Sequence, residues 1–150
     1  MVIGANGQLG RCIKDAVSEE NTVEYLFTTR DMLSITNKDA LKAFFSKHTF
    51  QYCINTAAYT NVEQAEKEKE AAFAINAEGV KNLAETCAEY NTTLIHISTD
   101  YVFDGKKGTP YNEEDTVNPI NVYGASKLKG EQHVQEICKK YFIINAFRQQ

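Results

Sequence analysis

The sequence predicts one α/β domain built on a parallel sheet with helices on both faces. Two observations lead to this fold class. Short strand-like segments alternate with helical segments along the chain, which is the pattern of βαβ units. A glycine-rich turn separates the first strand from the first helix, as in sheets that bind dinucleotides. We therefore expect a Rossmann-like, doubly wound sheet, and 150 residues are enough for one such core.

The strands are expected where apolar or β-branched residues run together or alternate with polar ones. They lie at residues 1–3, 22–28, 51–55, 92–98 and 141–144. The helices are expected where apolar residues recur every three or four positions. They lie at residues 11–17, 38–47, 63–90 with a break near 67–70, and 121–140. A turn at Asp104-Gly105 and an irregular loop precede the last helix.

The composition argues against several classes of protein. The net charge is −4 and no basic stretch exceeds two residues, which argues against a nucleic-acid or anionic-membrane surface. No run approaches the roughly 18 apolar residues of a membrane span, and no signal-peptide pattern opens the chain. Cys12, Cys53, Cys87 and Cys138 are far apart in the sequence. They are interpreted as buried thiols of a cytoplasmic protein, with no disulfide framework and no metal site.

Three glycines follow the first expected strand and precede the first expected helix. Gly4 lets the chain turn sharply, Gly7 lets backbone N–H groups approach a pyrophosphate, and Gly10 lets the helix pack close to the strand. An ordinary glycine-containing loop is the alternative, because such a motif is a weak signal by itself.

A positive side chain lies where a dinucleotide fold meets the adenosine ribose. That position is about 20 residues after the glycines, and Arg30 stands there. An arginine suits the 2′-phosphate of NADP, whereas the neighbouring Asp31 would favour NAD. Two solvated loop charges are the third interpretation. Further on, the small residues Ala57 and Ala58 would let a flat cofactor lie against the backbone, unless they form a simple turn.

Tyr123 and Lys127 are four residues apart in the last expected helix and therefore share one face. An ammonium beside a phenol lowers the pKa of the phenol, which makes Tyr123 a usable proton donor. A surface helix with an accidental Tyr/Lys pair is the alternative. This alternative is less well supported, because five stretches of the sequence reach the same edge of the expected sheet. They are residues 4–10, Arg30, residues 57–60, Thr99 and the helix that carries Tyr123.

Four segments carry a resemblance to a known family. They are GANGQLG at 4–10, NTAAYTNVE at 55–63, HISTDYVFDG at 96–105 and NVYGASKL at 121–128. Together they resemble the dTDP-4-dehydrorhamnose reductases, which belong to the extended short-chain dehydrogenase/reductase superfamily. The resemblance runs from Gly4 to about Ile144.

The resemblance implies that NAD(P)H, with NADPH preferred, reduces the C4 ketone of a dTDP-linked 4-keto-6-deoxy sugar to dTDP-L-rhamnose. Tyr123 would donate the proton, Lys127 would lower its pKa and hold the nicotinamide ribose, and Thr99 would donate a hydrogen bond to the substrate oxygen. The candidate cofactor contacts are Gly4, Asn6, Gly7, Gln8, Leu9, Gly10, Arg30, Ala57, Ala58, Tyr59, Tyr123 and Lys127. The candidate substrate contacts are Thr60, Thr99, Asp100 and Tyr101. The full-length form would be a possible homodimer.

Three positions depart from the family pattern. Ser34 replaces an acidic residue, which leaves its adenosine contact open, and Ile3 replaces a threonine. Cys12 stands where some members bind magnesium through a glutamate, so no metal is expected. Two other functions remain open. One is a non-catalytic nucleotide-binding subunit like the regulatory subunit of methionine adenosyltransferase, against which the intact set of Thr99, Tyr123 and Lys127 argues. The other is a reductase or epimerase of another sugar nucleotide.

Residues 1–150 are expected to be a truncated NAD(P)-binding domain that is inactive by itself. The first strand has about three residues, where about five or six are usual. The chain ends soon after the fifth strand, before the C-terminal substrate domain of extended reductases. Its ending, residues 145–150, also departs from the family pattern.

Overall fold

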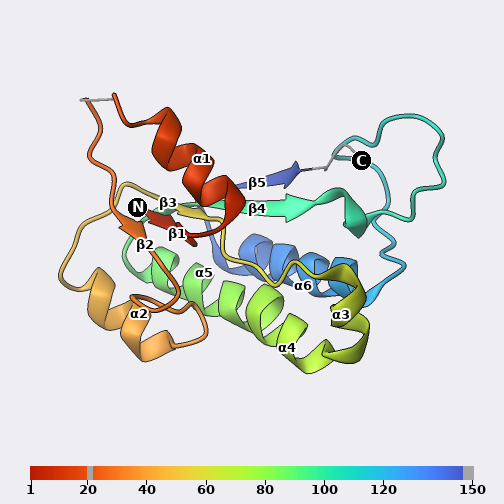
Figure 1. Ribbon diagram of the computed structural model, residues 1–150, viewed down its shortest axis with the longest axis horizontal. Helices are drawn as coiled ribbons and strands as arrows, with labels where there is room; N and C mark the ends of the chain where they lie inside the picture. The colour runs from red at the N-terminus through yellow and green to blue at the C-terminus, as the bar shows by residue number, and fades with distance from the viewer. Residues whose placement is uncertain (20–21, 147–150) are drawn as a thin grey trace.

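Five parallel strands form the centre of the computed structural model, which describes residues 1–19 and 22–146. The strand order is β2-β1-β3-β4-β5, so the chain winds away from β1 in both directions (Figure 1). The strands are β1 (Val2–Ile3), β2 (Phe27–Thr28), β3 (Tyr52–Asn55), β4 (Thr93–Thr99) and β5 (Tyr141–Ala146). Each overlaps a strand that the sequence predicts, which confirms the α/β class and the Rossmann-like sheet.

The helices also follow the predicted order. They are α1 (Gln8–Ala16), α2 (Lys38–Phe45), α3 (Val62–Lys67), α4 (Lys69–Phe73), α5 (Val80–Glu89) and α6 (Val122–Ile137), with a π-helical segment η1 (Ala74–Gly79) and a 3₁₀ turn η2 (Asp100–Val102). The expected break in the long central helix lies at Glu68, whose φ of −118° and ψ of 49° are not helical. The sequence pattern did not predict the π-helical segment.

Asparagine side chains fix where three of these helices begin. Asn37, Asn61 and Asn121 accept hydrogen bonds from Ala40 N at 3.0 Å, Gln64 N at 3.0 Å and Gly124 N at 2.7 Å, respectively. Each bond satisfies an amide that has no partner inside the helix. The cap at Asn121 matters most for function, because it starts α6 immediately before Tyr123.

Two predicted boundaries are wrong. The strand expected at 22–28 is reduced to β2, because β1 offers it two partners: Val2 pairs with Phe27 and Ile3 pairs with Thr28. The helix expected to reach residue 140 ends at Ile137, because Cys138 has extended backbone angles and its thiol donates to the Ala84 carbonyl at 3.5 Å. The chain thus turns toward α5 and begins β5.

The main hydrophobic core lies between the sheet and the layer formed by α2, α5 and α6. The core includes Ile3, Leu41, Phe45, Cys53, Val80, Leu83, Cys87, Leu94, Val134 and Cys138. The hydrogen bond with the neighbouring Cys53, and then burial, raise the pKa of the Cys87 thiol, so this thiol stays protonated. Three of the four cysteines are therefore buried as expected. The interpretation is wrong for Cys12, which is exposed on α1.

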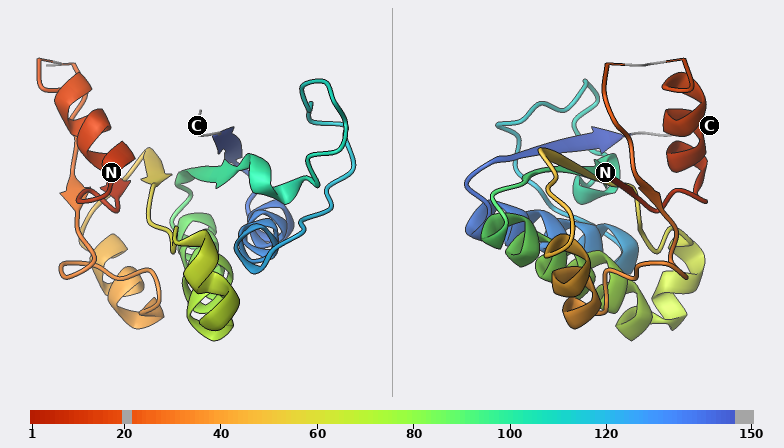
Figure 2. Two further views of the ribbon diagram at one scale, coloured as in Figure 1. Left: turned by 45° about the vertical axis from the view of Figure 1, so that its right-hand side comes forward. Right: turned by 90° about the vertical axis from the view of Figure 1, so that its left-hand side faces the viewer.

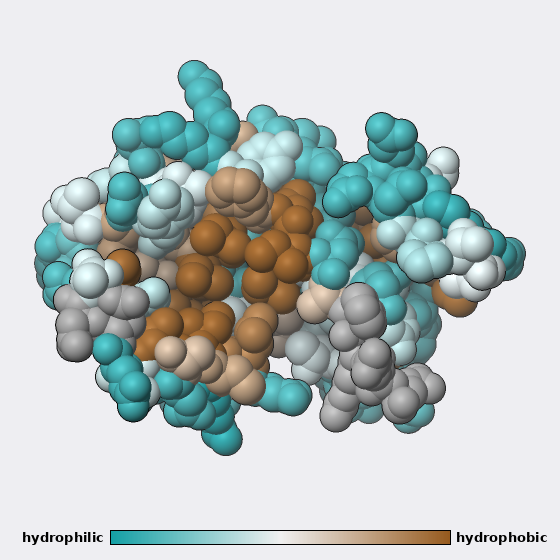
Figure 3. Space-filling view, turned by 90° about the horizontal axis from the view of Figure 1, so that it is seen from above, coloured by the Kyte–Doolittle hydropathy of each residue, from teal (hydrophilic) through white to brown (hydrophobic). Residues whose placement is uncertain are grey.

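The opposite face of the sheet carries α1 (Figure 2). Next to α1 an apolar surface is visible in Figure 3. Tyr52, Phe142 and Ile144 are exposed, and they alternate along their strands with Cys53 and Ile143, which pack in the core. Within residues 1–19 and 22–146, no helix is long and apolar enough to cross a membrane. Residues 147–150, which belong to the unusual ending, lie outside the described part of the chain.

Candidate active site

The carboxyl edge of the sheet gathers the predicted site stretches, at the end toward which the β4 and β5 arrows point in Figure 1. A pocket opens there beside β1 and β3. It is lined by Ile3, Gly4, Asn6, Gly7, Arg30, Leu33, Ser34, Ile35, Thr36, Thr56, Ala57, Ala58 and Ile75. The glycine loop, Arg30 and the small residues after β3, which are far apart in the sequence, therefore line one pocket.

The glycine loop has the tight geometry that the sequence predicts. Gly4 has a φ of +86°, a conformation that residues with a Cβ rarely adopt. A Cβ on Gly10 would lie 2.5 Å from the Gly4 carbonyl oxygen, so only glycine lets α1 start this close to β1. Gly7 caps α1 without a side-chain hydrogen bond to the first turn. The first amides of α1 are thus left for an anion, which the helix dipole also favours.

Arg30 and Ser34 lie in the wall of this pocket, whereas Asp31 does not. Arg30 is exposed, so its guanidinium can reach a ligand without a buried-charge cost. Ser34 Oγ lies 2.9 Å from Thr36 Oγ1. A serine in place of the family's acidic residue also leaves no carboxylate at this position to repel a phosphate.

Glu68, at the end of α3, holds the side chain of Tyr59. The Tyr59 phenol donates to Glu68 Oε2 at 2.8 Å. Burial of the phenol, and then the Glu68 carboxylate, raise its pKa. Tyr59 does not line the pocket and Thr60 is exposed. Ala57 and Ala58 form the pocket wall at this point, and the cofactor contact expected of Tyr59 stays a prediction.

Asn76 is a site residue whose importance the sequence did not reveal. It is buried in η1, where Oδ1 accepts from Tyr59 N at 2.8 Å and Nδ2 donates to Tyr59 O at 3.0 Å. Nδ2 also donates to Ser126 Oγ at 3.0 Å, and that hydroxyl donates to Tyr123 O at 2.7 Å. Asn76 thus connects the loop after β3 to the first turn of α6.

The start of α6 is held from two sides. Glu66 Oε1 of α3 accepts from Val122 N at 2.8 Å, which adds a charged acceptor to the Asn121 cap. A Cβ on Gly124 would lie 2.1 Å from the Tyr101 carbonyl oxygen, so this glycine permits close contact between α6 and η2. The backbone around Tyr123 is therefore tightly placed.

Thr99, Tyr101 and Tyr123 meet where β4 ends. The Thr99 hydroxyl donates to Asp100 Oδ1 at 3.1 Å, and the rings of Tyr101 and Tyr123 make an edge contact at 5.6 Å. Burial raises the pKa of Tyr123, Thr99 lowers it, and Asp100 and Tyr101 raise it further, so the net direction is upward. The phenol therefore stays protonated around neutral pH.

The prediction that Lys127 lowers the pKa of Tyr123 is wrong for this structure. Lys127 is 2% exposed and its Nζ donates to the Ile97 carbonyl at 2.7 Å. Burial lowers the pKa of Lys127 to about 8, with Glu131 acting in the opposite direction. Burial is the largest cause of the raised pKa of Tyr123, and Lys127 is not among the groups that shift it. A raised pKa still suits a proton donor, because a donor must carry its proton.

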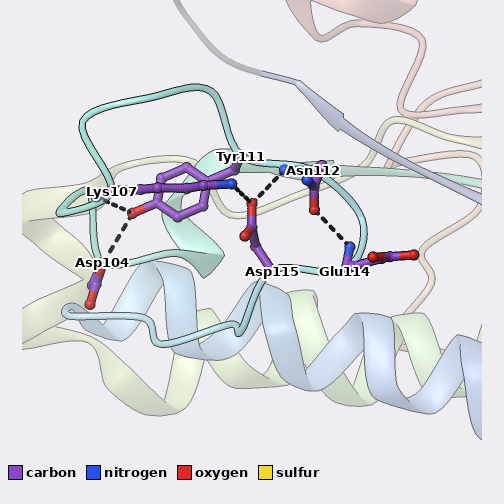
Figure 4. A network of polar contacts seen from close by, with 6 residues as sticks. All are labelled: Asp104, Lys107, Tyr111, Asn112, Glu114 and Asp115. Atoms are coloured by element: carbon purple, nitrogen blue, oxygen red, sulfur yellow. Dashed lines mark hydrogen bonds and ion pairs between the residues drawn. The ribbon is translucent and has the colours of Figure 1, made fainter.

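The irregular loop between η2 and α6 is organised by its own side chains, as Figure 4 shows. Asp104 accepts from Tyr111 Oη at 3.0 Å, Asn118 Nδ2 at 3.2 Å and the Lys106 amide at 3.1 Å. Lys107 Nζ and Asp115 Oδ2 form an ion pair at 2.5 Å. The Lys106 amide, Asn118 and Tyr111 lower the pKa of Asp104, so its carboxylate remains a stable anchor. The turn and loop predicted here are confirmed.

A Rossmann-like sheet with a glycine loop and a Tyr-x-x-x-Lys helix at its carboxyl edge is the arrangement of the short-chain dehydrogenases/reductases. Within this class, the chain belongs to the family described as "RmlD substrate binding domain", which matches residues 1–146.

Similar proteins in other organisms agree with this assignment. The dTDP-4-dehydrorhamnose reductase of Aggregatibacter actinomycetemcomitans is 40% identical over 144 residues, covering 96% of this chain and 49% of that protein. The protein of the same name from Mycolicibacterium smegmatis is 45% identical over 146 residues, covering 96% of this chain and 43% of that protein. The chain thus spans about half the length of these curated relatives.

Solved structures are also similar to almost all of this chain, which matches about half of each of them. The dTDP-4-dehydrorhamnose reductase from Bacillus anthracis, in complex with NADP, has a TM-score of 0.90 and 40% identity, covering 97% of this chain and 52% of that one. The orthologue from Clostridium acetobutylicum has a TM-score of 0.92 and 42% identity, covering 96% and 51% of the two chains.

Proposed function

We propose that this chain is the NAD(P)-binding and catalytic part of an NADPH-dependent reductase that acts on a dTDP-linked 4-keto-6-deoxy sugar and forms dTDP-L-rhamnose. The observation that carries the proposal is the single edge that holds the Arg30 pocket, Thr99 and the Tyr123 helix. The relatives named dTDP-4-dehydrorhamnose reductase supply the substrate class. The buried thiols of Cys53, Cys87 and Cys138 fit a cytoplasmic setting.

The pocket residues fit a dinucleotide phosphate. A Cβ on Gly4 would lie 2.7 Å from Ala57 N, and one on Gly10 would lie 2.5 Å from Gly4 O, so glycine at both positions lets the loop pack closely enough to present the first amides of α1 to a phosphate. Arg30 would pair with the 2′-phosphate. Ala57 and Ala58 would let the cofactor lie against the end of β3. When bound, NADPH supplies the hydride that reduces the ketone.

The chain's own residues then handle the proton and the developing charge. Thr99 donates a hydrogen bond to the ketone oxygen, which orients it and stabilises negative charge as it develops. Tyr123 gives its phenolic proton to that oxygen, so the ketone becomes an alcohol and the tyrosine a phenolate. Lys127 binds the nicotinamide ribose through its ammonium. Asp100 and Tyr101 contact the sugar. A purely nucleotide-binding subunit would have no need for the intact set of Thr99, Tyr123 and Lys127.

Cofactor preference tests the Arg30 assignment. The parent chain is expected to bind NADPH more tightly than NADH. Arg30→Ala is expected to narrow that gap by about 1 to 3 kcal/mol, the worth of a charge-assisted hydrogen bond. Fluorescence titration of the 150-residue chain with both cofactors measures this difference in affinity. Asp31→Ala is the matched control, because Asp31 does not line the pocket. Equal affinities in the parent, or an unchanged gap in Arg30→Ala, would contradict the assignment.

A further inference from the structure

Two buried charged side chains on successive turns of α6 hold the end of β4. Lys127 Nζ donates to the Ile97 carbonyl at 2.7 Å. One turn later, Glu131 Oε1 accepts a hydrogen bond from the Ser98 hydroxyl. Ile97 and Ser98 immediately precede Thr99, so α6 is bound to the two residues that deliver Thr99 to the site.

The same carboxylate also joins β5 to this arrangement. Asn145 Nδ2 donates to Glu131 Oε1 at 3.1 Å and to the Thr99 carbonyl at 3.0 Å. Glu131 therefore lies where α6, β4 and β5 meet. Through Asn145 it also influences the backbone of Thr99 itself.

The burial of Glu131 makes a merely incidental role implausible on energetic grounds. Glu131 is 6% exposed and Lys127 is 2% exposed, and a buried charge is costly unless an opposite charge and hydrogen bonds compensate for it. Residues four apart on a helix lie on one face. Burial raises the pKa of Glu131, whereas the hydrogen bonds from Ser98 and Asn145 and the Lys127 ammonium lower it and so favour the carboxylate. Burial lowers the pKa of Lys127, whereas Glu131 raises it, and the result is a value of about 8.

Other charged groups around this pair have different effects. His96 of β4 also interacts with Lys127, but burial and the ammonium itself keep the pKa of His96 well below its usual range, so the imidazole is neutral. The His96 Nδ1 atom forms a hydrogen bond with Asn55 Nδ2 at 3.1 Å. Asp100 and Tyr101 of η2 act on Tyr123 instead. Among the described residues, Glu131 is thus the negative charge that balances Lys127.

We propose that Glu131 is a positioning residue for the reaction: its carboxylate keeps Lys127 in the ammonium form and holds the Thr99 end of β4 against α6. The catalytic consequence rests on the proposed function. The effect on Lys127 does not, because it follows from the buried pair alone.

The first test measures the titration of Lys127 directly. The 150-residue chain is labelled with ¹³C at the lysine Cε, and the Lys127 signal is assigned by its loss in Lys127→Arg. Glu131→Gln keeps the size and the hydrogen-bonding oxygen of the side chain but removes the charge. It is expected to lower the pKa of Lys127 by about one unit or more, the usual effect of losing a close opposite charge. Glu136→Gln is the matched control on the same helix, where the Glu136 side chain is 67% exposed, and it should leave the signal unchanged.

A second variant keeps the test decisive if Glu131→Gln does not fold. Ser98→Ala removes the hydroxyl that stabilises the Glu131 carboxylate, so it weakens the negative charge and should shift the pKa of Lys127 in the same direction by a smaller amount. An unchanged Lys127 titration in whichever of the two variants folds overturns the proposal.

The second test uses turnover in the longest protein that contains this sequence. As the ammonium form is lost at high pH, kcat/KM for NADPH should fall, and Glu131→Gln should move this alkaline limb to lower pH by the shift seen for Lys127. If the role of Glu131 were purely structural, Glu131→Gln would lower activity by the same factor at every pH. That result would overturn the part of the proposal that concerns catalysis. No turnover in the parent protein would contradict the proposed function instead, while the Lys127 titration would still decide the role of Glu131.

Discussion

Tyr123→Phe is expected to lower turnover by at least about 100-fold, because a positioned general acid contributes about 10²- to 10⁴-fold to such a step. The variant removes the proton and keeps the ring. Its edge contact with Tyr101, at 5.6 Å in the parent, should therefore survive, and the affinity for NADPH should remain nearly unchanged. The raised pKa of Tyr123 supports this role, since the phenol carries its proton at the pH of the assay.

The measurement is the initial rate of NADPH oxidation with the 4-keto sugar nucleotide, in the longest protein that contains this chain. Tyr141→Phe serves as the control, because it removes the same hydroxyl from an exposed tyrosine on β5. Rates close to the parent in Tyr123→Phe, with the control also normal, would remove Tyr123 from the mechanism.

Lys127→Met should have the second large effect, on both stability and turnover. Methionine fills a similar volume but leaves the Ile97 carbonyl without its partner at 2.7 Å and leaves Glu131 buried without its counter-charge. Lys127 and Glu131 are two buried charges that favour each other's ionised form, and leaving one such charge without its compensation typically costs about 3 to 5 kcal/mol. Turnover should fall by about two orders of magnitude or more, the scale on which loss of a stabilising charge acts.

Urea unfolding of the 150-residue chain measures the stability change, and the rate assay measures turnover. Lys129→Met is the matched control two residues further along α6. Because Lys129 is only half-buried, its replacement should change stability by less than about 0.5 kcal/mol. A Lys127→Met variant as stable and as active as Lys129→Met would show that the buried ammonium has neither role.

Local sequence patterns predicted most of the architecture because each element carries its own periodicity. The alternation in β4 and the apolar stripe of α5 are readable without knowledge of their partners. The length of β2 could not be predicted in this way, because it depends on how few residues β1 offers for pairing. In the same way, the end of α6 depends on the contact between Cys138 and α5.

The functional site, too, could be predicted from the sequence only in part. Spacing, together with the expected convergence at one sheet edge, predicted that the glycine loop and Arg30 would lie together, and both line one pocket. The roles of Tyr123 and Lys127 stay predictions. The direction of the Tyr123 pKa could not be predicted, since burial by neighbouring elements determines it. The roles of Asn76 and Glu131 depend on partners 14 to 50 residues away along the chain, and a sequence pattern shows only that each is a polar residue in a helix.

The central claim is that this sheet edge transfers hydride from NADPH to a sugar ketone. It is tested most directly with NADPH that carries deuterium at the transferable position of the nicotinamide. The longest protein containing this chain is incubated with this cofactor and a dTDP-linked 4-keto-6-deoxy sugar, and the product is analysed by NMR. We predict deuterium bound to C4 of the sugar and a new hydroxyl on the same carbon. In Tyr123→Phe, this labelled product should form at least about 100-fold more slowly. Product formed without deuterium at C4, or no product from protein that binds NADPH, would contradict the account.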